Sequence, residues 1–154
     1  MAQYTCPSPI GPLSLVEENG ALVEVRWNFD LPRDAAPLAL PATPLLRQAA
    51  AELTNYFAGQ LREFTVPLAP KGTPFQQKVW AALREIPYGE TRSYKELAIA
   101  IDNEKACRAV GMANNRNPLP IFIPCHRVVG SDGKLVGYAG GLDGKTFLLE
   151  LEKK

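Results

Sequence analysis

The sequence predicts a mixed α/β (α+β) fold in two parts: a small, strand-rich N-terminal domain with a helix, residues 1–70, and a helical C-terminal domain, residues 71–154. An Asn-Gly pair between two apolar runs indicates a hairpin of strands in the first part. Two capping boxes, each followed by apolar residues at helical spacing, indicate helices in the second part. Residues 66–72, which include two prolines, separate these patterns and are typical of a linker.

The N-terminal domain begins with residues that favour strands. Leu13–Val16 and Leu22–Trp27 flank Asn19-Gly20, so we expect two antiparallel strands joined by a tight turn. Residues 30–44 hold four prolines and little periodicity, which predicts a loop.

One helix should follow that loop. Thr43 before Pro44 is a typical helix start, Gly59 is a typical stop, and the apolar residues between them share one helical face. No pattern in this domain indicates chemistry, and we expect it to support the domain that follows.

The C-terminal domain should begin with three helices. Thr73-Pro74-Phe75-Gln76 combines a capping box with a proline at the first helical position, and Pro87-Tyr88-Gly89 stops that helix. Ser93-Tyr94-Lys95-Glu96 is a second capping box, Asp102-Asn103 favours a tight turn, and a third helix should cover residues 104–115. Two short helices joined by so short a turn indicate a helix-turn-helix, a pattern that ordinary helical hairpins share.

The third helix has an unusual composition. Ala106, Cys107, Ala109 and Gly111 are small, and Arg108 is the one long cation among them. Small residues favour close packing of helices in a core, and they equally suit a helix that must approach a narrow groove without bulky side chains. Both interpretations stay open on composition alone.

A proline-punctuated apolar run ends in the only Cys-His pair of the chain. Ile121–Ile123 and Val128-Val129 predict buried strands or strand-like segments, and Pro124 stiffens the backbone before Cys125. A neighbouring imidazole such as that of His126 can help a thiol to become a nucleophilic thiolate. Taken alone, however, such a pair is more often a buried structural cysteine beside a hydrogen-bonded histidine.

A set of short motifs between Thr73 and Glu152 changes this balance. In order, they are Thr73-Pro74-Phe75-Gln76, Ile86-Pro87-Tyr88-Gly89-Glu90-Thr91, Ser93-Tyr94, Arg108-Ala109-Val110-Gly111, Asn117-Pro118, Pro124-Cys125-His126-Arg127-Val128-Val129 and Gly137-Tyr138-Ala139-Gly140-Gly141-Leu142. Their sequence and order resemble the O6-alkylguanine-DNA alkyltransferases, also called methylated-DNA–protein-cysteine methyltransferases.

The resemblance implies a DNA repair protein. Members of that family flip O6-alkylguanine out of double-stranded DNA and transfer the alkyl group irreversibly to a cysteine, here Cys125, once per molecule. O4-alkylthymine stays open as a second substrate. The resemblance also implies a ribonuclease-H-like N-terminal domain, a winged helix-turn-helix-like DNA-binding element in the C-terminal domain, and a reaction without cofactor or metal.

The family pattern also implies catalytic roles. His126 would deprotonate Cys125 through a water, Glu152 would orient His126, and Tyr94 would crowd the phosphate beside the lesion and supply a proton to the departing guanine. Two glutamates compete for the histidine. Glu152 shares the inward face of the two leucines one turn before it, whereas Glu150 points nearly the opposite way. Helical spacing and the family pattern therefore both favour Glu152.

The remaining implied contacts involve DNA and the base pocket. The third helix would enter the minor groove, where little base readout is available, and Arg108 would fill the space left by the extruded guanine. Asn117 would tie this helix to the active-site segment. The implied DNA-binding residues are Tyr94, Ala106, Cys107, Arg108, Ala109 and Gly111, and the implied pocket and hinge residues are Asn117, Val128, Tyr138, Ala139 and Gly140.

Charge and cysteine usage narrow the class of protein. The net charge of +1 divides into −3 for residues 1–70 (four bases, seven acids) and +4 for residues 71–154 (13 bases, nine acids). A modest basic excess suits a polyanionic partner, as it suits many solvated surfaces. Three cysteines without CxxC spacing, one histidine, no signal peptide and no long apolar span predict free thiols, no structural zinc, no membrane segment and a cytoplasmic location. We expect a monomer.

Some residues depart from the family pattern. Asp102 and Glu104 replace the usual glycine and proline between the two short helices, and Cys107 stands where alanine is usual.

Two other functions remain open. One is a non-catalytic relative that only binds alkylated bases, which Cys125 argues against. The other is a cysteine hydrolase, for which no nucleophile motif is present. A helix-turn-helix regulator of undamaged DNA is a third.

Overall fold

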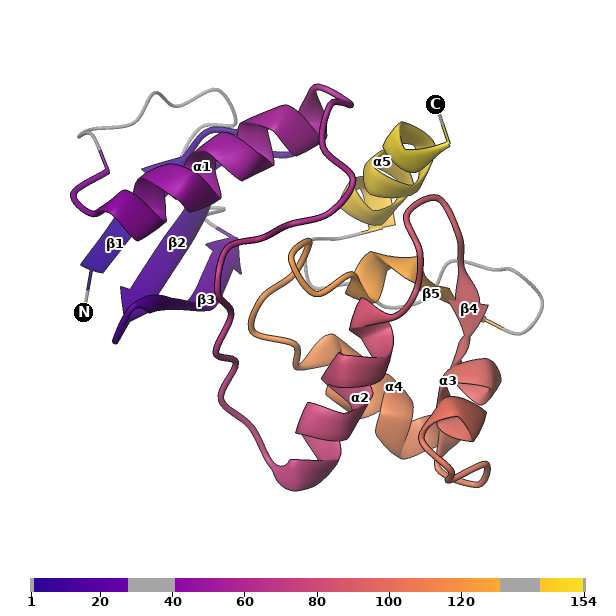
Figure 1. The fold of residues 1–154 in the computed structure, drawn as a ribbon. Helices are drawn as coiled ribbons and strands as arrows, with labels where there is room; N and C mark the ends of the chain where they lie inside the picture. The colour runs from indigo at the N-terminus through magenta and orange to yellow at the C-terminus, as the bar shows by residue number, and fades with distance from the viewer. Residues whose placement is uncertain (1, 28–40, 131–141, 154) are drawn as a thin grey trace. The chain divides into compact units, whose positions relative to one another are not determined.

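The computed structural model describes residues 2–27, 41–130 and 142–153 (Figure 1). The chain divides into two units, Met1–Pro70 and Lys71–Lys154. Among the described residues, no helix combines the length and the apolar character that crossing a bilayer requires.

The first unit is built on a three-stranded antiparallel sheet. Its strands are β1 (Ala2–Cys6), β2 (Leu13–Glu18) and β3 (Ala21–Trp27), in the order β1-β2-β3. The predicted hairpin between β2 and β3 is confirmed: Asn19 and Gly20 both adopt positive φ, which suits the tight turn. Strand β1 pairs with β2 and was not predicted, although its five residues alternate between apolar and polar side chains.

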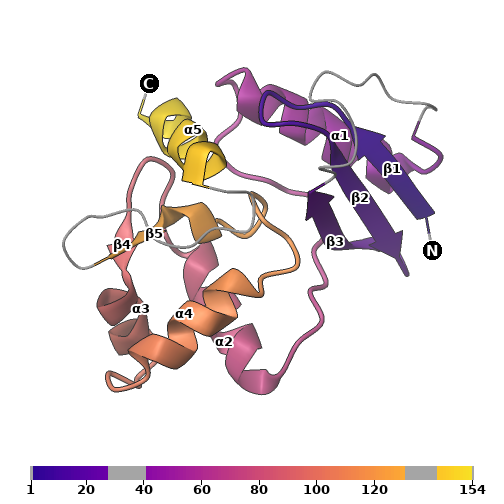
Figure 2. The ribbon, with the colours of Figure 1, turned by 180° about the vertical axis from the view of Figure 1, so that it is seen from behind.

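One helix covers the sheet of this unit, as both ribbon views show (Figures 1 and 2). Helix α1 (Pro44–Phe57) begins where the sequence predicted, and the Thr43 hydroxyl accepts from the backbone N–H of Leu46 at 3.1 Å. The proposed linker of residues 66–72 was too long. Val66 is buried and Leu68 forms a β-bridge with Leu22, so these residues belong to the first unit.

The second unit is mostly helical. It contains α2 (Pro74–Arg84), β4 (Arg92–Ser93), α3 (Tyr94–Ala100), α4 (Cys107–Asn115), the 3₁₀-helix η1 (Cys125–Arg127), β5 (Val128–Val129) and α5 (Leu142–Glu152). Helices α2, α3 and α4 pack against one another, and the short connection between α3 and α4 gives the predicted helix-turn-helix (Figure 2). The parallel pairing of β4 with β5 places the start of α3 beside the end of η1.

Local signals set most helix boundaries in this unit. Both predicted capping boxes are present, Thr73 with Gln76 and Ser93 with Glu96. Helix α4 begins at Cys107, later than the predicted residue 104, because Asp102 turns the chain with φ of 57° and no side chain caps the helix before that point.

The predicted strand at Ile121–Ile123 is wrong. Ile121 has φ of 75°, and the segment forms a buried turn closed by a 2.8 Å hydrogen bond from the Ile123 N–H to the Leu119 carbonyl. The prolines on either side lack the N–H groups that a strand ladder needs. The apolar character of this run reflects burial of a turn, and only Val128–Val129 pairs as a strand.

Helix α5 starts at Leu142, so Asp143 lies within its first turn. A carboxylate there interacts favourably with the helix dipole. The helix ends at Glu152, which brings this residue to the site described next.

Candidate active site

Cys125 begins η1 and is only 5% exposed. Burial raises the pKa of its thiol to about 11, against opposing effects from a hydrogen bond with Asn117 and from the charge of Lys145. A thiol with this pKa is protonated at neutral pH, since each pKa unit changes the thiolate fraction about tenfold. A nearby base is therefore required before Cys125 can act as a nucleophile.

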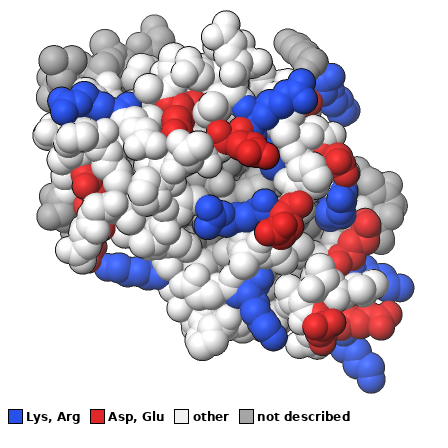
Figure 3. Space-filling model, in the orientation of Figure 1, with Lys and Arg blue, Asp and Glu red and all other residues white. Residues whose placement is uncertain are grey.

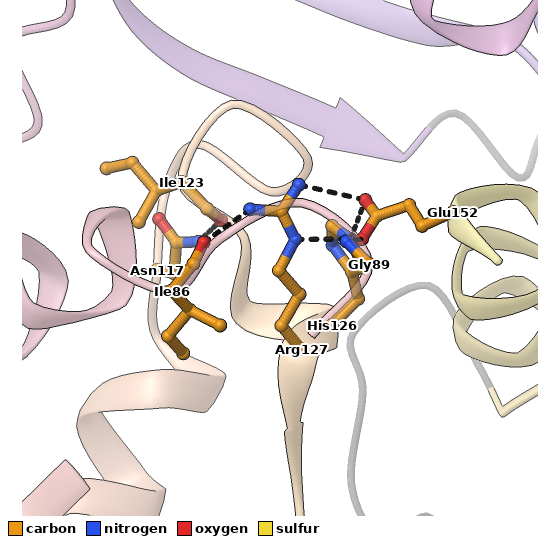
Figure 4. A network of polar contacts seen from close by, with 7 residues as sticks. All are labelled: Ile86, Gly89, Asn117, Ile123, His126, Arg127 and Glu152. Atoms are coloured by element: carbon orange, nitrogen blue, oxygen red, sulfur yellow. Dashed lines mark hydrogen bonds and ion pairs between the residues drawn. The ribbon is translucent and has the colours of Figure 1, made fainter. Parts of the chain in front are cut away.

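His126 follows Cys125 in η1 and is completely buried. Its Nε2 lies 2.7 Å from Oε2 of Glu152 (Figure 4), so Nε2 carries the proton and Nδ1 is left as an acceptor. Among the described residues, Nδ1 has no hydrogen-bond partner. Burial lowers the pKa of His126, although Glu152 opposes that shift, so the imidazole is neutral at neutral pH. Glu150 is exposed and pairs instead with Lys153.

Arg127 completes the buried charge cluster (Figure 4). Its Nε lies 2.8 Å from Oε1 of Glu152 and its Nη2 lies 3.0 Å from Oε2, which is a bidentate ion pair. The third nitrogen, Nη1, donates to the Ile86 carbonyl at 2.7 Å, and the guanidinium carbon lies 5.7 Å from the centre of the Tyr88 ring. The backbone N–H of Gly89 adds a 3.3 Å contact to Oε1 of Glu152.

Lys145 brings a second buried cation to the site. Its side chain is 0% exposed, and Nζ donates to the Val128 carbonyl at 2.6 Å. Burial lowers the pKa of Lys145, whereas the negative charge of a Cys125 thiolate raises it. The same attraction favours the thiolate form of Cys125.

Asn117 connects α4 to the turn that precedes Cys125. Its Nδ2 donates to the Ile123 carbonyl at 2.8 Å (Figure 4). Its Oδ1 accepts from the Leu119 N–H at 2.9 Å. Both amide groups of one buried side chain therefore hold the turn.

Tyr94 is the first residue of α3, and its ring lies against α4. Its ring packs on Gly111, where an added Cβ would come within 3.7 Å of the ring. Burial raises the pKa of Tyr94 and the charge of Cys125 raises it further, while a hydrogen bond with Asn114 lowers it. The hydroxyl of Tyr94 and the thiol of Cys125 thus share one electrostatic environment.

The exposed face of α4 carries small residues, the long cation Arg108 and the large apolar side chain of Met112. Arg108 and Ala109 are exposed, Cys107 is half-buried, and Val110 and Ala113 pack inward. The remaining small residues of the predicted contact face, Ala106 and Gly111, are also half-buried. The composition of this helix is therefore not explained by packing in a core alone, because part of its small-residue face is open to a partner.

Both domains of one protein family match this chain. The description "6-O-methylguanine DNA methyltransferase, ribonuclease-like domain" matches residues 1–70, and "6-O-methylguanine DNA methyltransferase, DNA binding domain" matches residues 74–154. The chain belongs to this methyltransferase family.

Relatives match this member of the family over nearly its whole length. A methylated-DNA–protein-cysteine methyltransferase of Methanosarcina barkeri is 52% identical over 95% of this chain and 93% of its own. A constitutive enzyme of the same name from Bacillus subtilis is 46% identical over 97% of this chain and 93% of its own. Among solved structures, Mycobacterium tuberculosis OGT in complex with DNA is 49% identical, covers 97% of this chain and 91% of its own, and has a TM-score of 0.85.

The surface charge of this methyltransferase is mixed. On the face shown in Figure 3, basic and acidic side chains are interspersed and neither sign forms a continuous patch. The two acidic departures from the family pattern, Asp102 and Glu104, are exposed beside the start of α4.

The predicted site residues are only partly described by the structure. Cys125, His126 and Glu152 lie in one buried cluster with Asn117 beside it, and Val128 contributes its carbonyl through β5. The predicted pocket residues Tyr138, Ala139 and Gly140 lie outside the described residues. Within the described ranges, no group of three or more His, Cys, Asp and Glu side chains gathers as a metal site would.

Three contributors were missed at the level of sequence: Arg127, Lys145 and Asn114. A usable signal existed for Lys145, because it precedes Leu148 and Glu152 by one and two helical turns and so lies on their inward face. Arg127 lies within the motif Pro124-Cys125-His126-Arg127-Val128-Val129, but its ion-pair partner, Glu152, is 25 residues away in the sequence. Only the folded structure brings the two side chains together. Asn114 follows Gly111 by one turn and so faces Tyr94 with it.

Proposed function

We propose that the protein repairs O6-alkylguanine in double-stranded DNA by transferring the alkyl group to Cys125, once per molecule. The observation that carries this proposal is the buried thiol beside a neutral imidazole whose far nitrogen is held by Glu152. The names of the relatives support the same chemistry. O4-alkylthymine is a further candidate substrate.

The reaction begins with a proton transfer. His126 accepts the Cys125 proton at Nδ1 through a bridging water, and the resulting imidazolium is stabilised by Glu152 across the 2.7 Å contact. At neutral pH a thiol of pKa about 11 is thiolate in only about one molecule in ten thousand. General-base assistance and the charge of Lys145 raise the thiolate population at the moment of attack.

The second step is a displacement at the alkyl carbon. The thiolate electron pair forms the C–S bond while the bond between that carbon and the guanine oxygen breaks. The electron pair of the broken bond stays on the guanine, which takes a proton from the Tyr94 hydroxyl. The product is a thioether, which water does not hydrolyse under these conditions, so Cys125 is consumed. The step needs neither cofactor nor metal.

DNA recognition is assigned to the helix-turn-helix. Helix α4 would enter the minor groove through its small residues, and Arg108 would replace the extruded guanine in the base stack. The exposed positions of Arg108 and Ala109 support this assignment. Tyr94 would press on the phosphate, and Asn117 would couple α4 to the active-site turn as a hinge. Ala106, Cys107 and Gly111 would complete the contact face.

The remaining assignments concern the pocket and the setting of the reaction. Val128, Tyr138, Ala139 and Gly140 would line the pocket for the flipped base. The ribonuclease-like unit would support the transfer domain. The free thiols of Cys6, Cys107 and Cys125 fit a reducing compartment, so we place the protein in the cytoplasm. We also propose that it is a monomer.

Intact-mass measurement tests this function. After incubation with duplex DNA containing O6-methylguanine, the protein should gain one methyl group, and peptide mapping should place it on Cys125. Cys125→Ser should bind the same DNA and gain no mass, because a hydroxyl is far less nucleophilic than a thiolate. Methyl transfer mapped to Cys6 or Cys107 would contradict the assignment, and repeated turnover on an ester would favour a hydrolase.

A further inference from the structure

The Glu152 carboxylate is shared between two basic side chains. It lies within 2.7 Å of the His126 imidazole and within 3.0 Å of two nitrogens of Arg127. All three side chains are buried, so solvent screens their charges little. Arg127 is permanently charged, whereas His126 can be neutral or charged. The fork of Arg127 is itself fixed, because Nη1 donates to the Ile86 carbonyl at 2.7 Å.

A buried carboxylate beside a histidine normally favours the imidazolium. The attraction between opposite charges raises the pKa of the histidine. A protonated His126 could not accept the proton of Cys125, so Glu152 alone would hinder the first step of the reaction. Here the permanent charge of Arg127 offsets the charge of Glu152, and the pair together is neutral.

We propose that Arg127 is a positioning residue for alkyl transfer: by holding and neutralising Glu152, it keeps His126 an oriented but uncharged base. This inference rests on the function proposed above. The charged groups that act on His126 are Glu152 and Lys145 from α5 and Arg127 from η1, and the titratable thiol of Cys125 precedes it in η1. Both cations disfavour the imidazolium, and burial disfavours it further. Glu152 is the one group that favours it.

Arg127 has a structural role as well, which the test must separate from this one. Through Glu152, Ile86 and the Tyr88 ring, it joins η1 to α5 and to the segment after α2. Loss of one partner from a buried ion pair is strongly destabilising. A lower melting temperature or a lower rate in an Arg127 variant would therefore follow from either role, and only the ionisation of His126 distinguishes them.

The chain offers a direct probe, because His126 is its only histidine. The imidazole signal in an NMR titration from pH 4.5 to 8.5 reports one group, in the full-length protein and without substrate. We expect the unmodified protein to show a His126 pKa below the ordinary 6.5. In Arg127→Met the pKa should rise by about one to three units. Arg84→Met is the control, since Arg84 is exposed on α2, and it should leave the titration unchanged.

A second variant keeps the test decisive if Arg127→Met does not fold. Arg127→Lys retains the charge without the fork, and its His126 pKa should stay below 6.5. An unchanged pKa in Arg127→Met, or a pKa of 6.5 or above in Arg127→Lys, would overturn the proposal. Methyl transfer by Arg127→Met, measured at pH 6 and pH 8, should be slowed at least tenfold more at the lower pH. If Cys125 proves not to be the alkyl acceptor, the proposed function is wrong. The titration still shows whether Arg127 keeps His126 uncharged.

Discussion

Alkylation of Cys125 should destabilise the protein. The thiol belongs to a residue that is 95% buried, and Ile123 and Val128 on either side of η1 are completely buried. A methyl group that found free space would contribute about 0.8 kcal/mol through burial. Forcing the same group into a well-packed site costs about 1–3 kcal/mol, because neighbours must leave their preferred rotamers. The second effect is the larger one, so we expect a net loss of stability.

The expected loss is measurable by thermal melting. For a chain of 154 residues, each kcal/mol lowers the melting temperature by about 2–4 °C. The net loss is then at most about 2 kcal/mol, so the methylated protein should melt up to about 9 °C below the thiol form, and a benzylated protein lower still. The strain should move the Asn117 hinge and the end of α4, so the methylated protein should also bind duplex DNA more weakly.

Matched samples decide whether this reasoning is correct. Cys125→Ser taken through the same incubation controls for DNA carry-over and for alkylation elsewhere, and its melting temperature should not change. Intact mass must first show complete methylation of the test sample. A methylated protein that melts at or above the temperature of the free thiol would refute the packing argument.

Three further outcomes are expected. Arg108→Ala should slow repair of duplex DNA at least tenfold more than reaction with free O6-benzylguanine, which needs no base flipping; equal slowing in the two rate assays would assign Arg108 a general structural role. The pKa of the Cys125 thiol is raised from 9.0 to about 11, so at pH values between 9 and 11 unfolding releases a proton from this thiol. The free energy of unfolding should therefore be unaffected by this thiol below pH 9 and should fall by up to about 3 kcal/mol as the pH rises to 11. Denaturant titration measures this fall, which should be smaller in Cys125→Ser. Chelator treatment should leave the transfer rate and the melting temperature unchanged, and a stoichiometric zinc signal lost together with activity would contradict this.

Features that depend on neighbouring residues could be predicted from the sequence. Asn19-Gly20 specifies its turn, and the pairs Thr73–Gln76 and Ser93–Glu96 specify helix starts through hydrogen bonds across three residues. The choice of Glu152 over Glu150 was also accessible, because helical periodicity separates residue 152 from residue 150. In each case the information lies within one turn of a helix or hairpin.

Features set by distant contacts could not be predicted. Ile121 adopts φ of 75° only because the surrounding fold holds it there, partly through the Asn117 amide at the Ile123 carbonyl. A β-branched residue in this conformation contradicts its own preference, so local reasoning favours a strand. The bidentate contact of Arg127 with Glu152 likewise depends on how η1 and α5 pack.

The surroundings of the three thiols favour Cys125 as the proposed acceptor. Burial raises the pKa of Cys6 to about 11, as it does for Cys125. The Cys6 thiol lies 3.5 Å from the Pro7 carbonyl oxygen, which accepts a hydrogen bond but is too weak a base to deprotonate a thiol. The Cys107 thiol lies 3.7 Å from the Glu104 carbonyl at the start of α4. Only Cys125 has an uncharged imidazole next in sequence and a buried cation that favours its thiolate. A thiol that reacts once gains from this arrangement, because a protonated, buried sulfur resists chance electrophiles until a substrate and a base are both in place.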